Sequence, residues 1–314
     1  MSRPGPGRSR SDGVTAASPT VSVILATNRA SPFLAEALAS VSQQSYQPIE
    51  LIVVDDGSVD TKSLDDAVAG IPMVRVMRQD AAGVAIARNN GAATATGDLL
   101  VFLDDDDRWH RDRLERQVEA FAANPSAVVG YCGMQSIDRA GNVIAPADQI
   151  AVASVADIAR RVTGIILPNM MIRRGAFETV RGFDGNLRLA EDLDLVLKLA
   201  QVGEFVFSPD VLVEYRSHPA NATKSYRALC AAIDQVVRSH LGDATVARDR
   251  TLGTALRESL RSNNRFAWWA AARNARAALG ERHVGAAVSD VVWALRFAPL
   301  GPADATLRRL RRSR

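Results

Sequence analysis

The chain has 314 residues, of which 47 % are hydrophobic and 23 % are charged, the proportions of an ordinary soluble globular protein. These values exclude a wholly disordered chain and a collagen-like repeat, and two cysteines are too few for a disulfide framework. We therefore expect a reducing compartment, the cytoplasm. No apolar stretch reaches the roughly 20 residues that a membrane-spanning helix needs.

Charge is distributed unevenly along the chain. Residues 1–19 carry a net charge of +2, residues 20–237 carry −8, and residues 238–314 carry +9. An acidic body with a basic C-terminal segment indicates that the two parts meet different partners. Nucleic acid is not expected among them, because the acidic body would repel phosphates beside the basic patch.

Three segments follow from the pattern of residue types. Residues 1–19 are rich in Pro, Gly, Ser and Arg and are expected to be disordered. Residues 20–222 alternate short apolar runs with helical periods, and residues 223–314 have a helical pattern rich in Ala and Arg. We place the domain boundary near residue 222.

Strands and helices are predicted in alternation from residue 21 onward. Apolar runs predict strands at 21–26, 51–54, 73–76, 99–103, 128–132, 165–172, 205–207 and 211–215. Helical periods predict helices after the cap Ser31-Pro32 and at about 82–94, 111–123 and 192–201. This order favours the α/β class, with a mostly parallel, doubly wound sheet and a C-terminal helical extension.

Two of the predicted strands end in acidic clusters. Asp55 and Asp56 close one strand, and Asp104 to Asp107 close another. In open α/β sheets ligands bind at the carboxyl ends of strands, so both clusters can line one crevice. Four adjacent carboxylates also favour a divalent cation such as magnesium or manganese. The alternatives are a solvated acidic turn for Asp104 to Asp107 and a turn that merely ends the strand for Asp55 and Asp56.

Two further positions are candidates for chemistry. Glu191, Asp192 and Asp194 open a predicted helix, where one carboxylate could act as a general base, or all three could simply interact with the helix dipole. His218 follows a predicted strand and is either a metal or phosphate ligand or an ordinary surface-loop histidine.

Five segments, taken together, resemble the motifs of a known family. They occur in order, at the family's spacing, over about residues 20–222: Val21–Arg29, Leu51–Ser58, Gly83–Gly91, Val101–Asp107 and Glu191–Asp194. The series resembles the inverting glycosyltransferases of family 2, which have the GT-A fold. This chain has Ala26-Thr27-Asn28-Arg29 where the family usually has Pro-Thr-Tyr-Asn.

The resemblance implies roles for particular residues. Ala26 and Thr27 match the strand end that touches the nucleotide base, Asp56 the aspartate that holds the base, and Arg88 a basic residue near the nucleotide. Asp104 and Asp106 match the outer acids of the D-x-D motif, which holds the ribose and a metal-bridged diphosphate, with Asp105 between them. Asp192 matches the catalytic base. His218 falls in a segment similar to the late histidine motif that reaches the metal or diphosphate.

The implied activity is transfer of a sugar from a nucleotide-sugar with inversion at the anomeric carbon. The donor is expected to be a UDP-sugar, the cofactor Mn²⁺ or Mg²⁺, and the acceptor a hydroxyl of a cell-envelope polysaccharide, a glycolipid or a similar carbohydrate. Two alternatives stay open, a sugar nucleotidyltransferase and a catalytically silent sugar-nucleotide-binding or scaffold protein. The Gly-rich signature of nucleotidyltransferases is missing after the first strand, where Asn28-Arg29-Ala30-Ser31 stands.

The C-terminal segment carries no catalytic motif. It contains Trp268, Trp269 and Trp293 among arginines, and it ends in the arginine-rich run 307–312. Basic helices with aromatic residues on one face can lie on anionic membranes, so peripheral contact with the inner face of the membrane is one expectation. The other is that the tryptophans pack on the catalytic domain.

Overall fold

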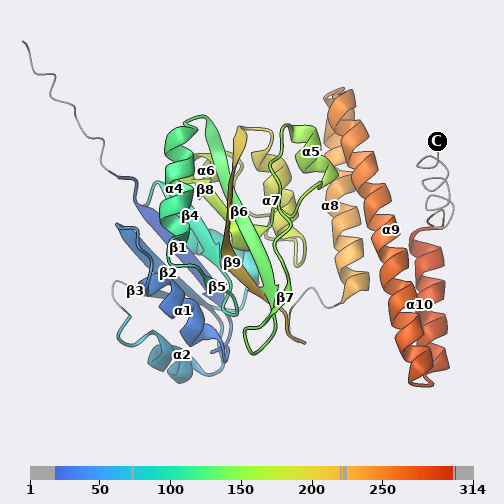
Figure 1. Cartoon of the computed structure of the whole chain (residues 1–314), viewed down its shortest axis with the longest axis horizontal. Helices are drawn as coiled ribbons and strands as arrows, with labels where there is room; N and C mark the ends of the chain where they lie inside the picture. Colours follow the sequence, from blue (N-terminus) through green and yellow to red (C-terminus); the bar gives the residue numbers. More distant parts are fainter. Residues whose placement is uncertain (1–17, 72–73, 220, 222–224, 300, 302–314) are drawn as a thin grey trace, which may run out of the picture.

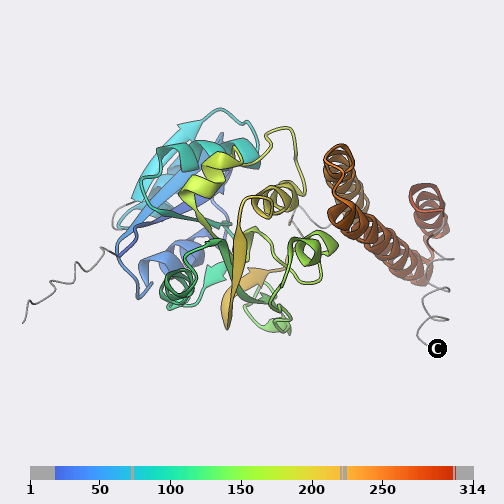
Figure 2. The ribbon, with the colours of Figure 1, turned by 90° about the horizontal axis from the view of Figure 1, so that it is seen from above.

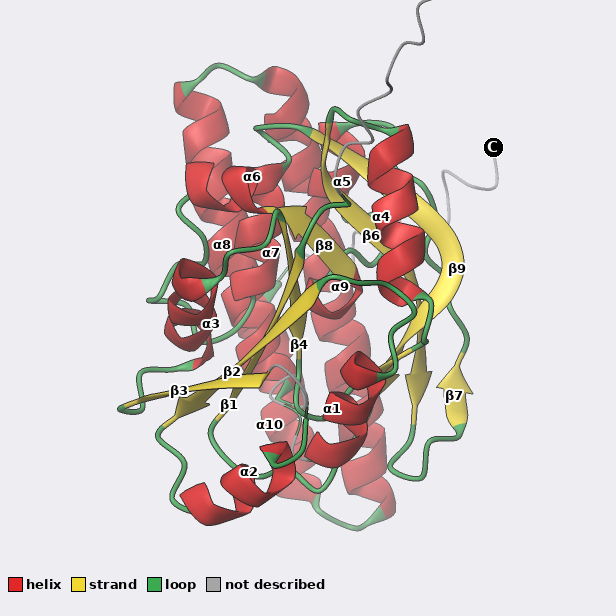
Figure 3. Ribbon diagram, turned by 90° about the vertical axis from the view of Figure 1, so that its left-hand side faces the viewer, coloured by secondary structure: helices red, strands yellow, loops and turns green. Residues whose placement is uncertain are grey.

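The structure is a computed structural model, and it describes residues 18–71, 74–219, 221, 225–299 and 301. Within these residues nine strands form one sheet, which Figures 1 and 3 show at the centre of the larger part of the molecule. The strands are β1 (Val21–Thr27), β2 (Ile49–Asp56), β3 (Val74–Gln79), β4 (Leu99–Leu103), β5 (Arg108–Trp109), β6 (Ala127–Ile137), β7 (Val143–Ala145), β8 (Met170–Arg173) and β9 (Glu204–Arg216).

The sheet has a parallel half and a mixed half. Its order is β3-β2-β1-β4-β8-β6-β9-β5, with β7 paired to β6. β3, β2, β1 and β4 are parallel, so Val23 lies opposite both Leu51 and Val101. β8 is antiparallel to both β4 and β6, whereas β6 and β9 are parallel. The α/β class is confirmed, and the sheet is mixed beyond β4.

Helices cover both faces of the parallel half because its strands are apolar on both faces. Val23 and Leu25 of β1 belong to one buried cluster, together with residues of α1 (Leu34–Ser42), α2 (Thr61–Val68) and α4 (Arg113–Ala123). Ile24, which points the other way, belongs to a second cluster with residues of α3 (Val84–Thr94), α6 (Arg174–Thr179) and α7 (Glu191–Leu199). This arrangement fixes the strand ends at which the site lies.

The C-terminal helices pack beside this sheet unit rather than on its strands. They are α8 (Tyr226–Val246), α9 (Arg250–Gly280) and α10 (Val284–Phe297). A third buried cluster joins α8 and α9 to α5 (Val155–Arg160) and α7, with Val237 and Leu256 on one side and Ala159 and Leu197 on the other. Figures 1 and 2 show α10 as the outermost element, packed on α9. No helix among the described residues is long and apolar enough to cross a membrane.

Most predicted elements are present with shifted ends. The strand expected at 99–103 has those bounds, and Ser31 caps the turn that leads into α1, since its Oγ accepts from the Phe33 amide at 3.2 Å. The run 165–172 divides into a 3₁₀ turn (Leu167–Asn169) and β8. The two strands expected at 205–207 and 211–215 are one strand, β9, because the register shift opposite Gly133 absorbs the residues between them.

Several predictions fall on residues outside the described part of the chain. Residues 1–17 lie outside it, as do Met73, the boundary region 222–224 and the arginine run 307–312. The disorder of residues 1–19 and the domain boundary near residue 222 therefore stay predictions. Pro19, just inside the described part, accepts a hydrogen bond from the Tyr46 hydroxyl at 2.6 Å through its carbonyl oxygen.

Candidate functional site

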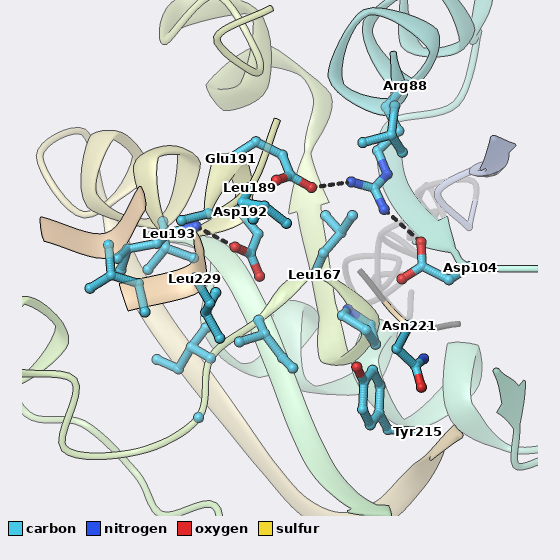
Figure 4. A pocket seen from close by; sticks show the side chains of 18 of the residues that line it. Arg88, Asp104, Leu167, Leu189, Glu191, Asp192, Leu193, Tyr215, Asn221 and Leu229 are labelled. Carbon is cyan, nitrogen blue, oxygen red and sulfur yellow. Dashed lines mark hydrogen bonds and ion pairs between the residues drawn. The ribbon is translucent and has the colours of Figure 1, made fainter. Parts of the chain in front are cut away.

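A pocket of about 850 Å³ opens at the carboxyl ends of β1, β2 and β4 (Figure 4). Its walls come from these strand ends and from α3, α5, α7 and α8. Eight of the nine predicted site residues line it: Ala26, Thr27, Asp56, Arg88, Asp104, Asp105, Asp106 and Asp192. The ninth, His218, contacts Asp106. The crevice expected from the two acidic strand ends is therefore present.

The acidic run after β4 is not a solvated turn. Asp107 is 1 % exposed, and its Oδ1 accepts a hydrogen bond from the Arg216 amide at 2.8 Å. Burial raises the pKa of Asp105 to about 6, and burial together with the charge of Asp104 raises the pKa of Asp106 and Asp107. The Asp104 side chain is 32 % exposed. Asp107 is thus a structural residue, whereas Asp104 to Asp106 face the pocket.

A buried arginine that the sequence analysis did not single out holds this turn. The Arg216 side chain is 1 % exposed, and its Nε donates to the carbonyl oxygen of Asp106 at 2.9 Å. Another of its nitrogens pairs with Glu36 at 2.6 Å, and its guanidinium lies 4.4 Å from the ring centroid of Phe33. The backbone of the acidic turn is therefore fixed by Arg216, the last residue of β9. An arginine at the end of an apolar strand, two residues before His218, was the available signal.

Asp106 is held by two side chains of the segment that follows β9. Its Oδ2 lies 2.8 Å from His218 Nε2 and 3.3 Å from Asn221 Nδ2. His218 is 6 % exposed, so it is not an ordinary surface-loop histidine. The structure brings the predicted metal ligands Asp106 and His218 together and adds Asn221, which sequence reasoning missed.

The described residues contain no ready-made cluster of three or more His, Cys, Asp or Glu side chains with metal-binding geometry. Asp106 bonds to His218, and Asp104 pairs with Arg88. The donor types nevertheless suit Mn²⁺ or Mg²⁺, which take carboxylate oxygens, and Mn²⁺ also accepts imidazole. Burial, and after it the charges of neighbouring carboxylates, raises the pKa of Asp105 and Asp106, and a divalent cation would offset both effects. Asp104, Asp106 and His218 fit such an ion in donor type and charge, provided that Asp104 turns from Arg88 and that Asp106 and His218 turn from each other.

Arg88 connects the two acidic regions of the pocket. Its side chain is 7 % exposed, and its two terminal nitrogens pair with Asp104 at 2.6 Å and with Glu191 at 2.8 Å, as Figure 4 shows. α3 supplies this arginine, the first residue after β4 the first carboxylate and α7 the second. The bridge ties the end of β4 to the residue directly before Asp192. Glu191 had no separate role in the sequence analysis, since a pairing over 103 residues leaves no local pattern.

The three acids in the first turn of α7 have different environments. Asp192 lines the pocket, and its Oδ1 accepts from the Leu193 amide at 2.8 Å. Burial, followed by the charge of Glu191, raises the pKa of Asp192 to about 6. Asp194 instead pairs with Lys198 at 2.6 Å and His240 at 2.9 Å, which ties α7 to α8. A shared interaction with the helix dipole does not account for these differences, and Asp192 combines a place in the pocket lining with a raised pKa.

The two acids that end β2 also have different structural roles. Asp55 forms the turn, since its Oδ1 accepts from the Ser58 amide at 2.8 Å. The two oxygens of Asp56 accept from the amides of Ala82 and Gly83 at 2.8 and 2.9 Å and so hold the start of α3. At Gly57 φ is +78°, and an added Cβ would lie 2.8 Å from Ala81 N, so glycine permits this approach. Asp56 thus lines the pocket and also braces the loop opposite.

At the end of β1, the Thr27 hydroxyl lies 2.6 Å from Asp105 Oδ2. This contact fixes the middle acid of the run against the neighbouring strand, with Ala26 beside it in the pocket wall. The predicted nucleotide-binding residues therefore line one pocket, at the ends of β1, β2 and β4 and on α3.

The tryptophans of the C-terminal helices do not share one environment. Trp268 Nε1 donates to the Ala298 carbonyl oxygen at 2.7 Å, and the Trp293 ring lies 5.2 Å from that of Tyr226. Trp269 is 57 % exposed, with the Arg273 guanidinium 4.2 Å from its ring centroid. Five aliphatic side chains on α10 are also more than a third exposed: Val284, Val288, Val291, Val292 and Leu295. Trp268 and Trp293 thus pack against other parts of the C-terminal helical segment, whereas the expectation placed them on the catalytic domain. Packing does not account for Trp269 or for this face of α10.

Sequence comparison with known proteins points to one family. The model of Glycosyl transferase family 2 matches residues 22–181, about half of the chain. The putative teichuronic acid biosynthesis glycosyltransferase TuaG of Bacillus subtilis is 28 % identical over 235 residues, which cover 72 % of this chain and 92 % of TuaG. A chondroitin synthase of Escherichia coli is 27 % identical over 191 residues, which cover 60 % of this chain and 27 % of that protein.

Comparison with solved structures shows the same fold. S. aureus TarS 1-349, solved in complex with UDP-GlcNAc, matches with a TM-score of 0.61 over 86 % of this chain and 90 % of that chain, at 14 % identity. Against another TarS crystal structure the match spans 43 % of that chain. The family match begins in β1 and includes β2, α3 and β4, the elements that carry or directly precede the polar residues of the pocket. The chain is therefore a glycosyltransferase of the GT-A fold and belongs to glycosyl transferase family 2.

Proposed function

We propose that this protein is a metal-dependent inverting glycosyltransferase that moves a sugar from a UDP-sugar to a hydroxyl of a cell-envelope polysaccharide or glycolipid. The observation that carries the proposal is the position of Asp192, a carboxyl with a pKa of about 6 in the same pocket as the acidic turn after β4. Relatives named for teichuronic acid and amylovoran biosynthesis, and a structural neighbour bound to UDP-GlcNAc, support the classes of acceptor and donor.

The donor is assigned to the polar side of the pocket. Ala26, Thr27 and Asp56 receive the base and ribose, with Asp105 beside Thr27. Arg88 contributes the positive charge near the nucleotide. A divalent ion held by the D-x-D acids Asp104 and Asp106, together with His218, would neutralise the diphosphate leaving group as a Lewis acid.

Asp192 is assigned the proton transfer. The acceptor hydroxyl loses its proton to the Asp192 carboxylate as its oxygen forms a bond to the anomeric carbon. The bond from that carbon to the diphosphate oxygen breaks in the same displacement, and the nucleoside diphosphate leaves with the electron pair. The transition state is oxocarbenium-like, and a single displacement inverts the configuration without a nucleophile on the protein.

The proposal is tested with a panel of nucleotide-sugars, each offered with Mn²⁺ and with EDTA. We expect one donor to raise the melting temperature only with metal, and donor hydrolysis or transfer to be measurable. Asp192→Asn is expected to keep donor affinity within about twofold and to lower turnover by about 10²- to 10⁴-fold. Asp66→Asn, at a 67 % exposed side chain on α2, is the matched control and should change neither.

Other outcomes identify the alternatives. A donor that binds without turnover, in wild type and Asp192→Asn alike, indicates a silent binding or scaffold protein. Pyrophosphate released from a nucleoside triphosphate and a sugar 1-phosphate indicates a nucleotidyltransferase. If no nucleotide-sugar binds under any condition, the proposal is wrong.

We also propose that the protein works in the cytoplasm, in peripheral contact with the inner face of the membrane. The contact surface is the exposed face of α10 with Phe266 and Trp269 of α9, which are 40 % and 57 % exposed. Residues 238–314 carry a net charge of +9, which complements an anionic lipid surface.

A further inference from the structure

The pocket has a second wall whose chemistry differs from that of the donor side. Six aliphatic side chains line it beyond Asp192, and we call them the aliphatic wall: Val152, Val162, Ile166, Leu193, Leu229 and Ile233. They come from the segments on either side of α5, from α7 and from α8. The motif analysis assigned no role to any of them.

This wall begins directly at the proposed base. Leu193 follows Asp192 in α7, and its amide donates to the Asp192 carboxylate at 2.8 Å. Figure 4 shows Leu193 and Leu229 on the side of Asp192 away from Arg88 and Asp104. Ile233 is one helical turn beyond Leu229 on α8, so the two side chains lie on the same face of that helix. An acceptor hydroxyl at Asp192 therefore places the next part of the acceptor against aliphatic carbon.

The wall is held in place by packing and by polar contacts behind it. Leu193 and Ile233 pack against the buried cluster that joins α5, α7, α8 and α9. Arg161 Nε donates to Ser259 Oγ at 3.0 Å, which fastens the end of α5 to α9. Asp194 and His240 join α7 to α8 at 2.9 Å. The aliphatic wall is thus part of a fixed surface between the sheet unit and the C-terminal helices.

Resting on the proposed function, we propose that the acceptor is amphipathic and presents a hydrocarbon chain to the aliphatic wall while its hydroxyl faces Asp192. The hydroxyls of a sugar chain need hydrogen-bond partners when they are buried, and these six aliphatic side chains supply none. The polar side chains that line the pocket between them, Asp157, Arg161 and Thr163, already bond to Ser154, Ser259 and the Ile150 amide. Methylene groups instead gain free energy on the same surface. A purely polysaccharide acceptor is the alternative that the test separates.

The test uses alkyl β-glucosides with methyl, butyl, hexyl and octyl chains, kept below their micelle-forming concentrations. Their affinity for the full-length protein is measured calorimetrically in the presence of Mn²⁺ and UDP. We expect affinity to rise about two- to fourfold for each added methylene, since each is buried on binding. In Leu229→Asn/Ile233→Asn the octyl affinity should fall at least tenfold while the methyl affinity stays unchanged.

Two further variants keep the result interpretable. Leu229→Ala/Ile233→Ala preserves helix propensity, so it tests the wall even if the asparagines disturb α8. It should show the same loss of octyl affinity in weaker form. Val288→Asn/Leu295→Asn makes a comparable change on the exposed face of α10, and it should leave the chain-length dependence intact. Affinity that does not depend on chain length in the wild type, or a dependence lost only in the α10 variant, overturns the proposal.

Failure of this inference can be told apart from failure of the proposed function. UDP-sugar binding is titrated first in the same samples, and it does not involve the aliphatic wall. Normal UDP-sugar binding without chain-length dependence overturns the hydrocarbon site alone. Absent UDP-sugar binding overturns the proposed function, and the glucoside series still reports on the wall because it requires no turnover.

Discussion

The two walls of the pocket differ in how their side chains are held. On the donor side, Arg88 pairs with Asp104 and Glu191, and Asp106 bonds to His218, so charged groups position one another. On the acceptor side, Leu193 and Ile233 are held by packing against neighbouring helices. The donor side is therefore sensitive to the loss of one charge, whereas the acceptor side tolerates changes of aliphatic shape. In the proposed function, the charged wall binds the donor by geometry and the aliphatic wall binds the acceptor through its apolar surface.

The largest expected effect is the loss of the arginine behind the acidic turn. Arg216→Met removes a guanidinium that is 1 % exposed and leaves the carbonyl oxygens of Asp106, Asp138 and Arg139 without their donor, while Glu36 keeps its pair with Arg108. We expect the free energy of unfolding to fall by about 3–5 kcal/mol, because each carbonyl oxygen left without a partner costs about 1–3 kcal/mol. Urea unfolding measures this. Arg116→Met, at an arginine that is 53 % exposed, should cost less than about 0.5 kcal/mol. Equal effects of the two changes would show that Arg216 does not hold the acidic turn.

The next effect concerns the bridge between the two acidic regions. Arg88→Met leaves Asp104 and Glu191 unpaired, and we expect a loss of about 2–4 kcal/mol, reduced because Asp104 is 32 % exposed. The same change removes a positive charge that lowers the pKa of Asp192. The pH at which turnover reaches half its maximum should therefore move upward. A stable variant with an unchanged pH profile would show that the bridge does not reach the proposed base.

The pH dependence of turnover should follow Asp192 in wild type. Its carboxyl is raised to a pKa of about 6 by burial and by Glu191, so the base is protonated below that pH and turnover rises as pH increases through it. Glu191→Gln removes the like charge, and we expect this limb to move downward by about 0.5–1 pH unit. The pH profile of kcat/KM measures this limb in wild type and in the variant. Asp194→Asn, in the same helical turn, should shift the limb less, because Asp194 is paired with Lys198 and His240.

Opposite shifts in Arg88→Met and Glu191→Gln would sharpen the assignment of the base. Burial alone would leave both variants with the wild-type profile, whereas the charges on either side of Asp192 act in opposite directions. Shifts in the same direction would mean that the two changes act through structure rather than charge. Circular dichroism at each pH separates unfolding from titration.

The sequence predicted the residues of the proposed donor side much better than those of the aliphatic wall. The strand of 99–103 and the acids after it form a local pattern, an apolar run followed by charge, and this pattern needs no knowledge of the fold. Asp56 and Asp104 were singled out in this way, whereas Asp192 was singled out by its place at the acidic start of a predicted helix and by the family resemblance. Glu191 and Arg216 were missed as partners because their contacts, to Arg88 and Asp106, join residues more than 100 positions apart.

Other differences have local causes. Helix α2 was not predicted because it is short and polar, and its start depends on Asp60, which accepts from the Ser63 amide at 3.0 Å. The aliphatic wall had no signal of its own, since Leu229 and Ile233 have the spacing of any helix that packs on a core. Only the fold shows that these two face a pocket.

The smallest expected effect on stability is at the outer face of α10, and it separates surface exposure from function. Val288 and Leu295 are 56 % and 50 % exposed, so Val288→Asn/Leu295→Asn should change the free energy of unfolding by less than about 0.5 kcal/mol. If this face contacts lipid, the same variant loses binding to vesicles that contain phosphatidylglycerol, because each aliphatic side chain contributes buried area. Co-sedimentation with vesicles, with and without phosphatidylglycerol, measures the loss. If wild-type protein fails to sediment with anionic vesicles, the exposed face of α10 serves another partner. The proposed donor binding at the polar side of the pocket would be unaffected.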